Sequence, residues 1–222
     1  MVVDVQELVR NFPRLFHMAE NSSWSSIKRH GLLSTSALLD LFQIKGQQRF
    51  AIESQRRPER VTITHPRYGT AVIRDQKPLN ETVLNRILVG MSPRQWFEAL
   101  NGRVFFWLTE ERLIGFLSAR SYRNQTHTVI TVDTRALLER HAEHIALTAF
   151  NTGSTYYNPP PRGIDTFLSI RDYPFDEWRR KRRVADAVVE LAVERGVADI
   201  SELVLAVAAW KADHLLTTIW RR

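Results

Sequence analysis

The stretch from Leu15 to Thr35, LFHMAENSSWSSIKRHGLLST, constrains the fold more than any other part of this sequence. A short apolar run that contains His17 predicts a strand. Ser22 or Ser23 is suited to cap a helix of about two turns that follows, because free N–H groups at a helix start need an acceptor. Gly31 stands where helices commonly end on a residue in the left-handed conformation. Strand, helix and turn in such close succession predict a small polar pocket between them.

The rest of the chain shows short segments of both strand and helix periodicity. Residues 60–65 alternate apolar and polar side chains as a strand does, and residues 103–108 are almost wholly apolar, which favours a buried strand. Asn80, Ser92 and Thr109 each precede a helical pattern and suit its N-cap. Short strands interrupted by helices predict an α+β fold.

The pair Tyr173-Pro174 is predicted to mark a boundary within the chain. Beyond it, apolar residues recur with helical spacing over 177–195, and Ser201 is suited to cap a last helix. The sequence therefore predicts a main domain over residues 1–173 and a small helical C-terminal appendage over residues 174–222.

Composition restricts the class of protein. Cysteine is absent, which excludes disulfides and thiolate metal sites, and no apolar window is long enough for a membrane span. The first residues lack a signal-peptide pattern, so a cytoplasmic protein is expected. Lys and Arg outnumber Asp and Glu by 31 to 24, with clusters at Gln55–Arg60 and Trp178–Arg183. This surplus suits a nucleic-acid partner, and the alternative is a merely basic protein.

A histidine that closes the first strand, followed by a helix ending in I-x-x-x-G-L at Ile27, Gly31 and Leu32, resembles the opening of the ADP-ribosyltransferase fold. More narrowly it resembles the DarT-type nucleic-acid ADP-ribosyltransferases and, at greater distance, the tRNA 2′-phosphotransferases. Three later segments correspond to the central strand, the substrate loop and the acid-bearing strand of that family: Val104–Thr109, Asn151–Thr155 and Gly163–Phe167. The resemblance covers roughly residues 12–172.

The resemblance implies a split β-sheet core surrounded by helices, and it implies an activity. A protein of this kind transfers ADP-ribose from NAD, its co-substrate, to a nucleobase in DNA, with RNA as the alternative. Such an activity is toxic to the cell that makes it. The resemblance therefore also implies a toxin or phage-defence role and a cognate antitoxin as a partner.

Several residues take roles in NAD binding by this resemblance. His17 would orient a ribose hydroxyl, and its alternative role is a strand-end histidine satisfied by the backbone. Gly31, Leu32 and Ser34 would approach the nicotinamide amide closely, where a Cβ is unwelcome. Trp107 would stack on the nicotinamide, with core packing as the alternative.

The charged candidates are an arginine and an acid. Arg74 is the candidate catalytic arginine and diphosphate clamp, because a guanidinium matches phosphate oxygens, unless Asp75 beside it ties it up in an ion pair. Asp165 stands where the family has a catalytic glutamate, and Asp172 and Glu177 are its rivals.

The loop after residue 150 is the candidate substrate-binding segment. Asn151, Ser154 and Tyr156 carry amide, hydroxyl and aromatic groups that suit recognition of a splayed base, and Tyr157 suits stacking. Long loops without secondary structure are often functional.

The sequence also contains features that suggest other sites and functions. His141 and His144 lie three residues apart without an evident third ligand, so a metal site is not expected. The basic run at Arg179–Arg183 is predicted to open a helix, where the dipole disfavours it, which hints at phosphate binding. Two alternative functions are an RNA 2′-phosphotransferase and a catalytically inactive nucleic-acid-binding module of the same fold, which the aspartate at 165 favours.

Overall fold

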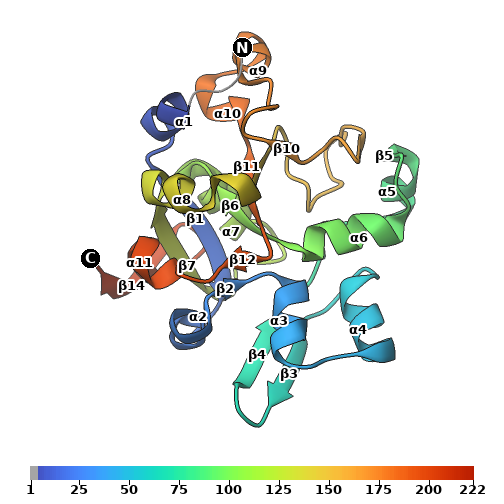
Figure 1. Ribbon diagram of the computed structural model, residues 1–222, viewed down its shortest axis with the longest axis vertical. Coiled ribbons are helices and arrows are strands. Elements are labelled where there is room, and N and C mark those ends of the chain that lie inside the picture. The colour runs from blue at the N-terminus through green and yellow to red at the C-terminus, as the bar shows by residue number, and fades with distance from the viewer. Residues whose placement is uncertain (1–4) are drawn as a thin grey trace.

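An eight-stranded antiparallel sheet with the strand order β10-β8-β11-β6-β1-β7-β13-β14 forms the centre of the protein (Figure 1). The computed structural model describes residues 5–222, so residues 1–4 of the predicted main domain lie outside the described part. Helices surround the sheet, and the chain is an α+β protein as the sequence predicts.

The strands of the main sheet are β1 Arg14–Glu20, β6 Arg103–Trp107, β7 Thr126–Asp133, β8 Ile145–Thr148, β10 Leu168–Ser169, β11 Glu190–Glu194, β13 Val204–Lys211 and β14 His214–Arg221. Three small pairs accompany it: β2 Leu32–Leu33 with β12 Gly196–Val197, β3 Val61–His65 with β4 Gly69–Ile73, and β5 Leu88–Val89 with β9 Arg162–Gly163. The helices are α1 Val5–Asn11, α2 Trp24–His30, α3 Thr35–Leu41, α4 Gly46–Glu53, α5 Glu81–Ile87, α6 Pro93–Asn101, α7 Glu110–Leu117, α8 Thr134–His141, α9 Phe175–Lys181, α10 Val184–Ala187 and α11 Ile200–Leu203, with a 3₁₀ turn at Ala142–His144.

Side-chain caps fix where five of these helices begin. In each case a side-chain oxygen accepts a hydrogen bond from a backbone N–H in the first turn: Ser34, Asn80, Ser92, Thr109 and Asp133. The caps at Asn80, Ser92 and Thr109 confirm the predicted helix starts. Ser23 precedes α2 as expected, but its hydroxyl donates to the carbonyl of Glu20 and caps no N–H group.

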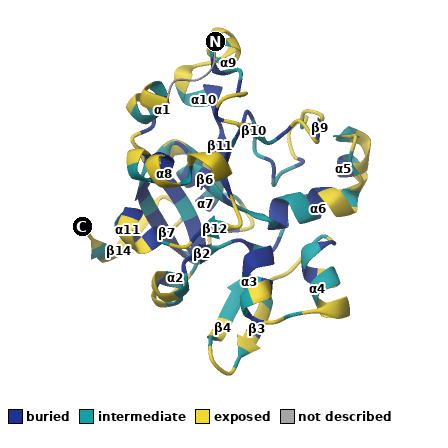
Figure 2. Cartoon of the chain, in the orientation of Figure 1, coloured by how far each residue is buried: buried dark blue, intermediate teal, exposed yellow. Residues whose placement is uncertain are grey.

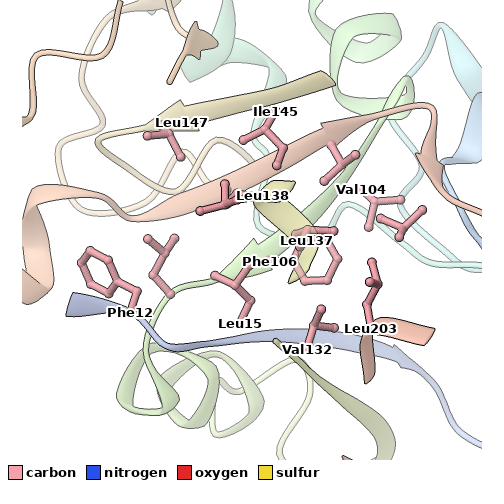
Figure 3. Close-up of a cluster of buried hydrophobic side chains, with 14 of the residues drawn as sticks. Phe12, Leu15, Val104, Phe106, Val132, Leu137, Leu138, Ile145, Leu147 and Leu203 are labelled. Atoms are coloured by element: carbon pink, nitrogen blue, oxygen red, sulfur yellow. The ribbon is translucent and has the colours of Figure 1, made fainter. Parts of the chain in front are cut away.

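Apolar side chains bury both faces of the sheet. On one face, Leu15, Phe106 and Val132 of the strands pack beneath Leu137 and Leu138 of α8 (Figure 3). On the other face, helix α7 packs its leucines on residues of β1 and β7. The buried residues follow the central strands, whereas the outer helices are largely exposed (Figure 2). Each fully buried leucine contributes roughly 1.5–3 kcal/mol.

The last quarter of the chain does not form a helical appendage. Only α9, α10 and α11 are helical there, and β11, β13 and β14 are strands of the main sheet. Strand β11 lies between β6 and β8 at the centre of the sheet, and all but its last residue are buried. A helix over 177–195 was predicted, but helical structure ends at Ala187 and Glu190–Glu194 is a strand. The segment Val188–Val193 is apolar almost throughout. Such a run fits a buried helix and a buried strand equally well until its neighbours are known.

The sheet opens between β1 and β6. These strands share a single registered residue pair, Phe16 with Trp107, whereas β1 and β7 share seven pairs. His17 is the next residue of β1 and reaches across the opening, with its Nδ1 2.9 Å from the carbonyl oxygen of Phe105. The opening therefore exposes the middle of the sheet beside His17.

Helices α3 and α4 and the hairpin of β3 and β4 form a lobe below the sheet in the view of Figure 1. The lobe has a core of its own, built on Leu39, Phe42, Ile52, Ile63 and Ile73. The hairpin ends at Ile73, so the lobe delivers Arg74 to the region of the opened sheet.

Candidate active site

A pocket of about 530 Å³ lies beside this opening, within the range of small-molecule and cofactor sites. Its lining includes His17 of β1, Gly31 after α2, Arg74 after β4, Trp107 of β6 and Glu190 of β11. The first four of these residues are predicted site residues, so the structure brings them together with an acid that the sequence did not indicate.

His17 is held as a neutral imidazole with one free nitrogen. The carbonyl of Phe105 can only accept, so Nδ1 carries the proton and donates it at 2.9 Å. Nε2 has no hydrogen-bond partner among residues 5–222 and can accept one from a ligand. Burial lowers the pKa of His17 to about 4, so the ring is uncharged at neutral pH.

The backbone at Gly31 requires glycine for two reasons. Its φ of 89° and ψ of 164° lie in a region that L side chains rarely adopt, and an added Cβ would lie 2.8 Å from the Cα of Ala198. Leu32 follows in β2, and the buried Ser34 accepts from the N–H of Ala37 at 3.2 Å. All three line the pocket, as predicted for residues that approach a ligand closely.

Arg74 lines the pocket without an ion pair to Asp75. The carboxylate of Asp75 instead accepts from the Tyr122 hydroxyl at 2.9 Å and from the backbone N–H of Lys77 at 3.2 Å. The Arg74 Nη2 atom is buried and has no hydrogen-bond partner in the described chain. A guanidinium with a buried, unsatisfied donor beside a pocket is suited to an anionic ligand.

Glu190 is a buried acid of the pocket lining, which also includes Glu20 and Asp75. It is 4% exposed and lies directly opposite Trp107 of β6 and Thr148 of β8. Residues paired in this way on antiparallel strands share a face, so Glu190 and the half-buried Trp107 point to the same side of the sheet. Trp107 also packs its ring 5.5 Å from that of Phe116, so it belongs both to the core and to the pocket wall.

The two oxygens of Glu190 have different surroundings. Oε2 accepts from the Thr152 hydroxyl at 2.7 Å, from the Thr152 N–H at 3.0 Å and from the Thr148 hydroxyl at 3.4 Å. Oε1 makes no hydrogen bond within the described residues. Burial raises the pKa of Glu190 to about 7, although these bonds and the charge of Arg162 oppose the rise. A carboxyl group poised in this range suits proton transfer at neutral pH.

The predicted substrate loop is divided between pocket and surface. Asn151 lines the pocket, but Ser154 does not, and its hydroxyl accepts from the Tyr156 N–H at 3.3 Å. Tyr156 is 55% exposed and lies outside the lining. The base of the loop is fixed by the buried Arg162, which donates to the carbonyls of Thr152 and Ser154 at 3.1 and 2.8 Å.

The structure does not place Asp165 in this pocket. Asp165 is exposed in the turn after β9, and neither of its rivals, Asp172 and Glu177, lines the pocket. Asp172 accepts from the Ser169 hydroxyl at 2.6 Å in a local turn. The prediction that Asp165 meets His17 around one ligand is therefore corrected. The acid-bearing strand expected at Gly163–Phe167 does not form, and Asp165 lies in the turn between β9 and β10, which is at the sheet edge.

Glu190 was missed because its segment was assigned to a helix. A signal does exist in the sequence: Glu190 is an acid within the apolar run from Val188 to Val193. A buried carboxylate is costly unless it is paired or used, so a single acid inside a buried strand indicates a functional site.

The basic run at 179–183 closes a helix and does not open one. Arg179, Arg180 and Lys181 lie in the last turn of α9, where the dipole favours cations. Arg179 pairs with Glu7, and Arg183 pairs with Asp186 at 2.7 Å. The argument for phosphate binding at this run therefore no longer holds.

His141 is engaged with an acid. Its Nε2 lies 2.7 Å from Asp199 Oδ1. Among residues 5–222, no group of three or more histidine or acidic side chains is arranged to hold a metal ion. Within the same residues, no helix has the length and apolar character to cross a membrane.

A model of a family of unknown function, DUF7002, matches residues 13–204. The chain belongs to this family. The DUF7002 segment runs from just before β1 to the first residue of β13, and so contains His17, Arg74, Glu190 and the rest of the pocket named above, whereas β14 lies beyond it. No curated protein matches the chain.

Proposed function

We propose that the chain is an NAD-dependent mono-ADP-ribosyltransferase of the DarT-like kind, which modifies a nucleobase in DNA, with RNA as the alternative. One observation carries the proposal: a neutral imidazole, a guanidinium with an unsatisfied donor and a buried carboxyl group line the same pocket. Glu190 takes the catalytic role in place of Asp165. Action on nucleic acid would place the protein in the cytoplasm.

The pocket offers what NAD requires. The diphosphate needs a cation with free donors, which Arg74 provides, and a ribose hydroxyl needs an acceptor, which His17 Nε2 provides. Gly31 and Leu32 line the pocket and would present their backbone groups to the nicotinamide amide, and Trp107 would offer an aromatic surface. NAD would supply an ADP-ribosyl group with nicotinamide as its leaving group.

Glu190 would act on both partners of the reaction. Loss of nicotinamide leaves an oxocarbenium-like sugar, the same electronic problem as glycoside hydrolysis, and a preorganised carboxylate stabilises that charge. As the base nitrogen or oxygen bonds to the anomeric carbon, the bond from that carbon to nicotinamide breaks and its electron pair leaves with nicotinamide. Glu190 Oε1, which makes no hydrogen bond to the described residues, would accept the proton that the base gives up.

Labelled NAD, incubated with single- and double-stranded oligonucleotides of every base, tests the proposal. Transfer of label and release of nicotinamide are expected, and Glu190→Gln should slow both by about 10²- to 10⁴-fold. Asp165→Asn is the matched control and should leave the rate unchanged, because Asp165 is exposed outside the pocket. If the wild-type protein labels no base and releases no nicotinamide, the proposal is wrong.

The toxin or phage-defence role has its own assay. Expression of the wild-type chain is expected to arrest growth, and expression of Glu190→Gln is not. Equal growth with both would remove the toxin role, and the antitoxin partner with it.

A second NAD-using reaction is compatible with the same pocket. The unsatisfied donor of Arg74 would bind the 2′-phosphate of an RNA as readily as a diphosphate. RNA with an internal 2′-phosphate, included as a substrate in the same assay, discriminates between the two. Loss of that phosphate without labelling of any base would favour the phosphotransferase.

A further inference from the structure

The head group of Arg74 is enclosed by Tyr122, which lies between α7 and β7, and by His127 of β7. The ring of Tyr122 lies 5.0 Å from Cζ of Arg74, and His127 Nδ1 lies 3.3 Å from Nη1. Both Tyr122 and His127 are almost fully buried, at 2% and 0% exposed. Neither was indicated by the sequence, and together they form the wall against which the guanidinium rests.

Hydrogen bonds fix the role of each ring nitrogen of His127. Nε2 lies 3.2 Å from the carbonyl oxygen of Tyr122, which can only accept, so Nε2 carries the proton. Nδ1 is therefore the acceptor for an N–H of Arg74. Burial and the Arg74 charge lower the pKa of His127 to about 4, so the ring stays neutral and does not repel the guanidinium at neutral pH.

Tyr122 binds the carboxylate of Asp75, the residue that follows Arg74 in the sequence. Its hydroxyl donates to Asp75 Oδ1 at 2.9 Å, and its ring stands against the guanidinium. Burial raises the pKa of Tyr122, so the hydroxyl keeps its proton and remains a donor. Asp75 is thus held by Tyr122 and by the Lys77 N–H, and Arg74 Nη2 keeps its donor unsatisfied within the described chain.

We propose that Tyr122 and His127 are positioning residues that keep the Arg74 guanidinium available to a diphosphate group in the pocket. His127 holds one terminal nitrogen through Nδ1, and Tyr122 keeps Asp75 from pairing with Arg74. Glu20, whose Oε1 pairs with Arg60 at 2.8 Å, is a further acid of the pocket lining and is also turned to another cation. The proposal depends on the proposed function in one respect, which is that the diphosphate belongs to NAD. The positioning role itself requires only a ligand that contains a diphosphate group.

Binding of inorganic pyrophosphate and of ADP-ribose to the full chain, measured by isothermal titration calorimetry, tests the proposal without any turnover. Arg74→Ala should weaken both by at least 10-fold. His127→Leu removes the acceptor and should weaken both by about 10-fold, since hydrogen bonds to charged groups are the stronger ones. His127→Asn places a side-chain oxygen near the position of Nδ1 and should stay within about threefold of wild type.

Tyr122→Phe keeps the ring but releases Asp75, and it should weaken binding by about 10-fold. A merely structural role would lower the melting temperature of these variants and leave the affinity of the folded protein unchanged. Wild-type affinity in both His127→Leu and Tyr122→Phe therefore overturns the proposal. So does wild-type affinity in Arg74→Ala.

A measurement on the wild-type protein covers the case in which His127→Leu does not fold. Nitrogen-15 NMR of the imidazole should show a proton on Nε2 of His127 and none on Nδ1, and the opposite tautomer overturns the proposal. Failure of the proposed function looks different. If the variants weaken ADP-ribose binding but no oligonucleotide is labelled, the positioning role stands and the transferase assignment falls.

Discussion

Replacement of Glu190 by glutamine should make the protein more stable at high pH and leave it almost unchanged at low pH. Glu190 is 4% exposed, and its ionised form is disfavoured by burial. A glutamine oxygen in the position of Oε2 can still accept from Thr152 and Thr148. The amide nitrogen would take the position of Oε1, which makes no hydrogen bond to the described residues, so no hydrogen bond is lost there. The substitution therefore removes a buried charge and keeps the hydrogen bonds.

The magnitude follows from the shift in pKa. The pKa of Glu190 rises from 4.5 to about 7 in the folded protein. At about 1.4 kcal/mol per pH unit, burial of the ionised form costs on the order of 3 to 4 kcal/mol. The penalty is absent below the unfolded-state pKa of 4.5, grows as the pH rises and is complete above about 7. Between pH 5 and 8, most of it, on the order of 2 to 3 kcal/mol, should appear as an increasing advantage of the variant.

Urea unfolding of both proteins at pH 5, 6, 7 and 8 provides the measurement. The pKa values of His17 and His127 are lowered from 6.5 to about 4 in the folded protein. Their contribution to the free energy of unfolding is therefore complete above pH 6.5 and is lost as the pH falls to about 4. Because both proteins contain both histidines, these contributions cancel in the difference. Glu194 is exposed at the end of the same strand, and Glu194→Gln should follow wild type within about 0.5 kcal/mol. A difference between Glu190→Gln and wild type that does not grow with pH would refute the argument.

Two further pairs of substitutions test the fold around the pocket by urea unfolding. Gly31→Ala should destabilise the protein by about 2 kcal/mol or more, because its Cβ would lie 2.8 Å from the Ala198 Cα at a positive φ. Gly115→Ala in α7, where a Cβ meets nothing within 4 Å, should instead stabilise it by about 0.5–1 kcal/mol. Leu191→Ala in the buried strand β11 should cost about 2–5 kcal/mol. Leu216→Ala in the edge strand β14, 52% exposed, should cost less than about 0.5 kcal/mol, and similar losses for the two leucines would contradict the observed sheet order.

Local chemistry explains which parts of the fold could be predicted. The N-caps at Ser34, Asn80, Ser92, Thr109 and Asp133 act through bonds to N–H groups three residues ahead, so neighbouring residues determine them. Gly31 and the alternating strand at 61–65 were predictable for the same reason. Of these residues, Gly31 and Ser34 line the pocket.

The C-terminal strands could not be predicted in this way. The segment Val204–Ala209, VLAVAA, contains good helix-forming residues, yet it lies in β13 because β7 offers it a ladder of backbone hydrogen bonds, interrupted once between Val204 and Ala206. A partner more than seventy residues away decided its structure. The prediction of Asp165 as the acid was wrong for a related reason. The acid proposed to act in the pocket, Glu190, lies on β11, which the sequence predicted to be helical.

The sequence by itself determined the α+β class, the starts of several helices and the turn at Gly31. Tertiary structure alone decided that Glu190 lies opposite Trp107, and that Tyr122 and His127 rest against Arg74. The physical reason is the range of the interactions. A cap or a turn depends on residues a few positions apart, whereas a buried carboxyl group acquires its pKa and an arginine its free donor from strands that only the folded sheet brings together.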